Sequence, residues 1–136
     1  MSRAHLKFLS GNYITYAVKA EQSGGSPKCR ICNTGNNETL SHVILSCPSL
    51  EAERKPIITE YEQLCGMTKN NINFQLITED PKHLCQFILD PSSMNLPVRV
   101  SISDPILSEM FKLSRDLCYK LDKTRTELIL NQKQNK

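Results

Sequence analysis

The stretch that decides the fold is Cys29-Arg-Ile-Cys32, a polar loop, and then His42-Val-Ile-Leu-Ser-Cys47. Its three thiols and one imidazole have the spacing C-x2-C-x9-H-x4-C. Zinc takes four ligands in a tetrahedron, and two cysteines separated by two residues can hold one ion from a single tight turn. The sequence therefore predicts a closed, structural Cys3His zinc site formed by Cys29, Cys32, His42 and Cys47.

The second half of this motif imposes a condition on the helix that carries it. Apolar residues around His42 fall at helical spacing, and Asn37 or Thr39 could cap that helix. Residues five apart on a continuous α-helix point roughly 140° apart, so His42 and Cys47 could not then reach one ion. We therefore expect the helix to loosen before Cys47. Pro48 favours this, because a residue that precedes proline avoids the α region.

The other uses of cysteine are weighed against this site. Cys29 and Cys32 could instead form a redox pair at a helix N-terminus. A disulfide scaffold does not fit, because no signal-peptide-like run is present and the other three thiols are scattered. We predict that Cys65, Cys85 and Cys118 lie in the core, with an extra metal ligand as the alternative for any of them.

Composition bounds the class of protein. The chain has 136 residues, of which 39% are hydrophobic and 6% aromatic, with no tryptophan. It has the length of one domain with a thin core, and such cores often need a metal or a partner. No apolar run is long enough to cross a membrane. We expect an intracellular protein of the nucleus or cytoplasm, not secreted and with no membrane partner, whose cysteines stay reduced.

The elements outside the motif predict a mostly α fold, a small helical domain with a zinc-stapled loop. Residues 3–9 have the pattern of a helix end, and 12–20 could form a strand or a helix. A helix follows the motif with acids in its first turn. Pro56 should end or kink it, because proline removes a backbone hydrogen bond. Another helical segment is expected at 57–65.

Two further helices are predicted in the second half of the chain. Asp-Pro pairs, which combine an N-cap with proline at the first helical position, mark their starts at 81 and 105. The last helix should reach about residue 130, with an apolar stripe whose commonest meaning is core or a partner helix. We expect a frayed polar tail at 131–136. Brief apolar or extended segments are expected at 72–77 and 96–102.

These elements suggest two regions. Residues 1–65 would form an N-terminal helix plus the zinc-binding module. Residues 66–136 would form a helical tail region that ends in a long helix and a disordered polar end.

The net charge is a mild +3, but the basic residues are concentrated at the two ends. Residues 1–32 and 112–136 each carry four more basic than acidic side chains, so the middle of the chain is acidic. This distribution suits a chain whose ends touch phosphates. A solvated surface is the plainer explanation of the same charges.

Three features together resemble the C-terminal region of LINE-type (non-LTR) retrotransposon reverse transcriptases. They are the leucine-rich segment Leu6-Lys-Phe-Leu-Ser-Gly-Asn-Tyr13, the C-x2-C…H-x4-C motif, and Pro48 followed by a charged helix that reaches Arg54. The resemblance covers roughly residues 4–56. It implies that the four motif residues bind zinc and that the module contacts nucleic acid downstream of a polymerase domain. Other domains of a retrotransposon polyprotein would then be its partners.

The chain departs from the whole family protein in its acidic residues. It has no Tyr-x-Asp-Asp motif and no paired acids in an apolar strand, whereas two-metal phosphoryl transfer needs convergent carboxylates. We therefore expect no polymerase activity and no enzyme. The chain has the character of a transposon fragment, which could be without a present function.

The leading hypothesis is a zinc-binding, nucleic-acid-binding accessory module that holds RNA or DNA non-specifically. Its predicted phosphate contacts are two residues beside the metal loop, which is the loop that carries Cys29 and Cys32, and three on the preceding helix: Lys28, Arg30, Arg3, His5 and Lys7. Tyr13 and Tyr16 are the nearby aromatic residues, and we expect them to be core tyrosines. The alternatives are a zinc-stabilised interaction module, whose last helix docks on another domain, and a redox enzyme.

Overall fold

The computed structural model describes residues 7–8, 13, 15–66, 81–89 and 104–134, and this part of the chain is mostly helical, as predicted. The elements are α2 (Tyr16–Ser23), the π-helix η1 (His42–Ser46), the 3-10 helix η2 (Pro48–Leu50), α3 (Glu51–Gly66), α5 (Pro81–Leu89) and α6 (Asp104–Gln134). Within these ranges, β-type pairing is confined to one antiparallel bridge between Lys28 and Asn37.

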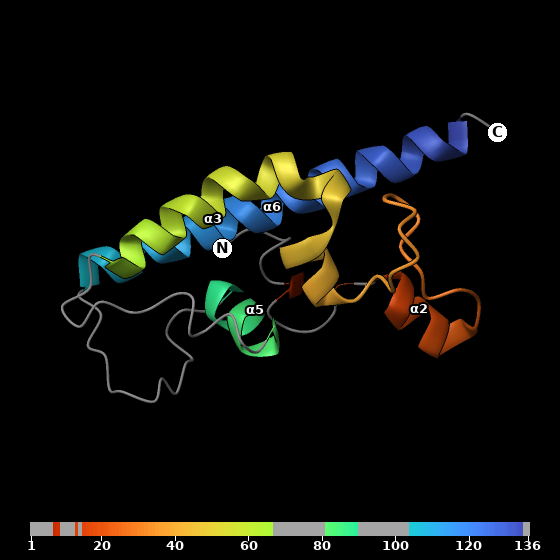
Figure 1. Cartoon of the computed structure of the whole chain (residues 1–136), viewed down its shortest axis with the longest axis horizontal. Coiled ribbons are helices and arrows are strands. Elements are labelled where there is room, and N and C mark those ends of the chain that lie inside the picture. The colour runs from red at the N-terminus through yellow and green to blue at the C-terminus, as the bar shows by residue number, and fades with distance from the viewer. Residues whose placement is uncertain (1–6, 9–12, 14, 67–80, 90–103, 135–136) are drawn as a thin grey trace.

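The two longest helices, α3 and α6, lie side by side and run in opposite directions (Figure 1). Ile57, Tyr61 and Cys65 are buried along α3. Residues four apart share one helix face, so these three side chains form the stripe that packs toward α6. The C-terminal half of α6 extends past α3 and reaches the metal loop, where the Gln132 side chain donates to the Arg30 carbonyl.

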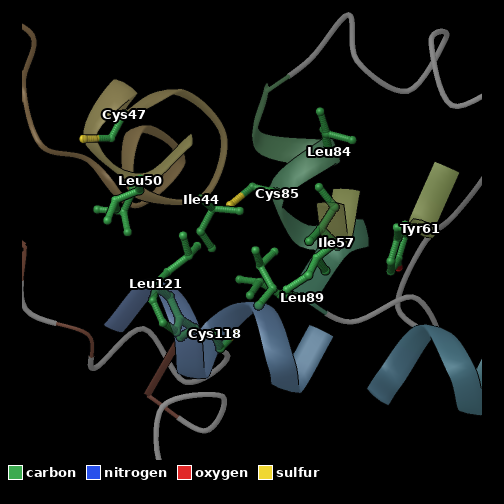
Figure 2. Close-up of a cluster of buried hydrophobic side chains, with 14 of the residues drawn as sticks. Ile44, Cys47, Leu50, Ile57, Tyr61, Leu84, Cys85, Leu89, Cys118 and Leu121 are labelled. Atoms are coloured by element: carbon green, nitrogen blue, oxygen red, sulfur yellow. The ribbon is translucent and has the colours of Figure 1, made fainter. Parts of the chain in front are cut away.

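The core continues from this pair into α5 and η1. Figure 2 shows Ile44 of η1, Cys85 and Leu89 of α5, and Leu121 of α6 converging on one apolar cluster. The stripe predicted on the last helix belongs to this core, where its central members are buried: Met110, Leu113, Leu117 and Leu121. The predicted burial of Cys65, Cys85 and Cys118 is confirmed, and all six cysteines are in the reduced, thiol form.

Two helices continue past the points where the sequence predicted that they could end. Pro56 does not end its helix, because α3 continues to Gly66 with the proline inside. The proline is exposed, and the burial of Ile57 and Tyr61 just beyond it offsets the missing hydrogen bond. The tail predicted to fray from 131 is instead helical up to Gln134, because α6 runs that far.

The ambiguous stretch at 12–20 resolves as a helix from residue 16. Thr15 is its N-cap, with extended backbone and a side-chain oxygen that accepts the Val18 N–H at 3.3 Å. Of the predicted helix end at 3–9, Lys7 and Phe8 are described, and both are helical. The segments predicted at 72–77 and 96–102 lie outside the described residues.

Candidate metal centre

The first half of the centre is a tight turn closed by backbone hydrogen bonds. The Cys29 N–H donates to the Asn36 carbonyl at 2.8 Å, and the Glu38 N–H donates to the Pro27 carbonyl at 2.9 Å. Inside this turn Asn33 and Gly35 have φ values of 52° and 85°. Both are left-handed conformations, which asparagine and glycine adopt more readily than other residues. These two residues therefore allow the loop to close tightly behind Cys32.

In the second half of the centre the helix is wider than an α-helix, and this brings His42 and Cys47 to the same side. The Cys47 N–H donates to the His42 carbonyl at 2.7 Å, which is the i→i+5 bond of a π-helix. That bond brings residue i+5 back over residue i, so the two side chains face the same way. The predicted loosening is confirmed, and Cys47 has the extended backbone expected before proline. Of the two candidate caps, Thr39 accepts the His42 N–H at 3.2 Å.

The four predicted ligand atoms meet at one point. Cys29, Cys32, His42 and Cys47 each offer one atom, and these atoms lie within 4.8 Å of one another. The sulfurs of Cys29 and Cys47 are 3.9 Å apart, and the Cys32 sulfur lies 3.5 Å from the His42 Nε2. In tetrahedral zinc sites these spacings are about 3.8 Å and about 3.5 Å, given the usual bond lengths. The residues fit one ion held by all four side chains.

Backbone N–H groups favour the thiolate form at this cluster. Burial raises the pKa of Cys29 to about 12, but N–H groups of Ile31 and Cys32 hydrogen-bond to its sulfur and oppose the rise. Burial likewise raises the pKa of Cys47, again opposed by a backbone N–H. Burial also acts to raise the pKa of Cys32, yet hydrogen bonds from Thr34 lower it below the usual value. A bound cation would stabilise the thiolate forms further.

The surroundings of His42 favour its neutral form. Burial lowers its pKa, an effect that the Glu38 carboxylate opposes and the Arg54 guanidinium supports. The imidazole is therefore neutral at physiological pH, which is the form that binds a metal.

Arg54 holds the π-helix η1 in place, a role that was not predicted from the sequence. Its buried guanidinium donates to three carbonyls, those of Ile44 at 2.7 Å, Cys47 at 3.0 Å and Val43 at 3.1 Å. Position 48 is a proline with no N–H, so it cannot supply the backbone donor that residues 43 and 44 would otherwise use. A proline after the motif, followed by an arginine in the next helix, is the sequence signal that points to this contact.

Glu38 connects the metal loop to α6. Its carboxylate is fully buried and makes two hydrogen bonds with the Arg125 guanidinium, at 2.7 and 3.0 Å. It also accepts the Tyr16 N–H at 2.8 Å and lies 3.9 Å from the Cys29 sulfur. Burial lowers the pKa of Arg125, but the pair with Glu38 raises it above its ordinary value. No local pattern marked this pair, because the two residues are far apart in the sequence.

The predicted nucleic-acid contacts divide into two groups. Lys28 and Arg30 are exposed beside the metal loop, and Lys7 is exposed as well. Arg3 and His5 lie outside the described residues. The Arg30 guanidinium lies over the Tyr16 ring at 4.5 Å.

The expectation of a core tyrosine is confirmed at Tyr13. It is buried, stacks on Phe8 with ring centroids 4.0 Å apart, and donates its hydroxyl to Asp122 at 2.8 Å. Tyr16 is half-buried, so part of it belongs to the surface.

Comparisons with known proteins add no relative: no family model, curated protein or solved structure matches the chain. Among the helices of the described ranges, none is both long and apolar enough to span a membrane. The assignment of the site therefore rests on its own geometry.

Proposed function

We propose that this chain is a zinc-stabilised module that binds nucleic acid. The observation that carries the zinc assignment is the convergence of three sulfurs and one imidazole nitrogen within 4.8 Å. Thiolate and imidazole ligands in a tetrahedron are typical of zinc, whereas magnesium and calcium prefer oxygen. Because the chain supplies all four ligands, the site has the closed form of structural zinc centres. Bound zinc would contribute folding energy rather than chemistry.

Elemental analysis of the purified, freshly reduced protein tests the zinc assignment. We expect about one zinc per chain, and its loss in both Cys47→Ser and His42→Ala. The matched control is Cys65→Ala, which removes a buried thiol outside the cluster and should keep the metal. Zinc-free wild-type protein, or zinc retained in both cluster variants, would reject the assignment.

The proposed ligand is RNA or DNA, held mainly through phosphates. Lys28 and Arg30 support this, because two exposed cations flank a cysteine whose backbone the metal would fix. Such contacts give binding that is independent of sequence and weakens as salt rises. This chemistry agrees with the resemblance to LINE-type reverse transcriptases. We propose that the chain derives from such a protein, as an accessory part that does not itself polymerise.

Fluorescence anisotropy with labelled single strands, measured against salt, tests the ligand. Each phosphate contact adds about 0.7 to the slope of log affinity against log salt. The double variant Lys28→Ala/Arg30→Ala should therefore lose about 1.4 from that slope. Lys55→Ala, at an exposed lysine of α3, is the control and should leave it unchanged. Equal low-salt affinities of wild type and double variant would refute these contacts.

A purely structural module is the second candidate. The observation in its favour is the tight connection of the metal loop to α6 through Glu38 and Arg125. Docking of the α6 stripe on another domain is not favoured, because Met110, Leu117 and Leu121 are already buried in this chain. A zinc-loaded monomer without salt-dependent nucleic-acid binding would select the structural candidate.

A further inference from the structure

A column of rings and guanidinium groups runs from the core to the surface beside the metal loop. Phe8 stacks on Tyr13 inside, and the Arg125 guanidinium lies 5.4 Å from the Tyr13 ring and 5.7 Å from the Tyr16 ring. The Arg30 guanidinium, 4.5 Å from the Tyr16 ring, is the exposed end of the column.

The charges along this column differ in a way that selects Arg30. Arg125 is paired with the buried Glu38 carboxylate, so its charge is compensated. Arg30 makes no hydrogen bond or ion pair through its side chain with any residue that the structure describes. Its charge and its N–H groups are therefore available to a ligand.

The position of Arg30 is also fixed from several sides. It lies in the turn between Cys29 and Cys32, so a bound metal would hold the backbone on both sides of it. Its carbonyl accepts the Gln132 Nε2–H at 2.7 Å. Tyr16 beneath it is anchored by its own N–H, which donates to Glu38 at 2.8 Å. Ordering a long side chain costs entropy, and contacts made before binding reduce that cost.

We propose that the Arg30 guanidinium, held over Tyr16, is a stacking surface for an unpaired base, so that the module prefers single-stranded nucleic acid. This rests on the proposed function and names its ligand class. A planar guanidinium offers a face for stacking and an edge of N–H groups for phosphate, whereas an ammonium offers only charge. Bases become available for such stacking in single strands, because in a duplex they are already stacked on each other.

The decisive comparison separates base from phosphate. Two labelled strands of about twelve nucleotides are titrated, one of normal composition and one with several abasic positions that keep every phosphate. The wild-type protein should bind the normal strand roughly fivefold more tightly, the lower end of what one stacked base contributes. Arg30→Lys keeps the charge and should bind both strands equally, at the affinity of wild type for the abasic strand.

Tyr16 provides an independent check on the same surface. Tyr16→Leu removes the ring under Arg30 and should reduce the preference for the normal strand. Tyr16→Phe is its matched control, which keeps the ring and should keep the preference. Zinc content and circular dichroism confirm that each variant is folded.

The outcomes distinguish this inference from the proposed function. Equal wild-type affinity for the two strands, or an unchanged preference in Arg30→Lys, overturns base stacking while phosphate binding stands. Binding of a matched duplex as tight as that of the single strand overturns the single-strand preference. Absence of binding to every strand rejects the proposed function and this inference with it.

Discussion

Arg54 offers the sharpest test of how the metal centre is held. In Arg54→Ala the carbonyls of Val43 and Ile44 lose their donor, and position 48 cannot replace it because it is proline. Both residues are fully buried, so water has no access to their side chains. A buried acceptor without a partner costs about 1–3 kcal/mol, and two of them cost about 2–6 kcal/mol. The whole free energy of unfolding of a natural domain is only about 5–15 kcal/mol, so this loss is a large part of it.

Urea unfolding followed by circular dichroism measures this loss, and competition with a chelator measures zinc affinity. Arg54→Ala should unfold at much lower urea and bind zinc about 10–100-fold more weakly, because Cys47 is no longer held beside His42. The stability and zinc affinity of Arg54→Lys should lie between those of the wild type and of Arg54→Ala, since one ammonium cannot reach three carbonyls. Cobalt substituted for zinc should show a changed visible spectrum in Arg54→Ala.

The control for these experiments is Arg115→Ala, which removes an exposed arginine from α6. Exposed substitutions usually change stability by less than about 0.5 kcal/mol. If the stability of Arg54→Ala lies within that margin of the stability of Arg115→Ala, and its zinc affinity is unchanged, the carbonyl contacts do not hold the π-helix η1. The reasoning would then be refuted.

Three more predictions follow from the same packing. Pro56→Ala should raise the stability of the protein, by up to about 3 kcal/mol in urea unfolding, because it restores a helical hydrogen bond at an exposed position; an unchanged midpoint would contradict this. Arg125→Ala should cost about 3–5 kcal/mol by leaving Glu38 buried and unpaired, and the double variant with Glu38→Gln should cost less than the two single losses together, as a double-mutant cycle would show. In the zinc-loaded protein Cys65, whose pKa burial raises to about 12, should react slowly with thiol reagents at neutral pH, whereas a chelator should expose Cys32 to fast labelling, with mass spectrometry as the readout.

The sequence predicted the local half of this site well. The ligand spacing and the loosening before Pro48 both depend on neighbours in the chain, and each is present in the structure. The form of the loosening was not predicted. Leaving the helix and widening it both satisfy the spacing, and the backbone takes the second course because it keeps a hydrogen bond to the His42 carbonyl.

The rest depended on contacts that no local pattern records. Glu38 and Arg125 are brought together by the path of α6 across the metal loop, so neither residue alone suggests burial. Pro56 misled for the complementary reason: its local cost is real, but the burial of Ile57 and Tyr61 against the core outweighs it. Propensity describes the segment, whereas the boundary is decided by what the segment packs against.

Each long helix contributes one arginine to one half of the metal centre. Arg54 of α3 holds the half that contains Cys47, and Arg125 of α6 holds Glu38 beside the Cys29 half. A metal that draws the two halves together therefore also fixes the places where α3 and α6 attach to them. Removal of the metal would release both attachments at once, because each arginine then loses an ordered partner. A bound metal would thus stabilise the pairing of the two helices as well as its own loop.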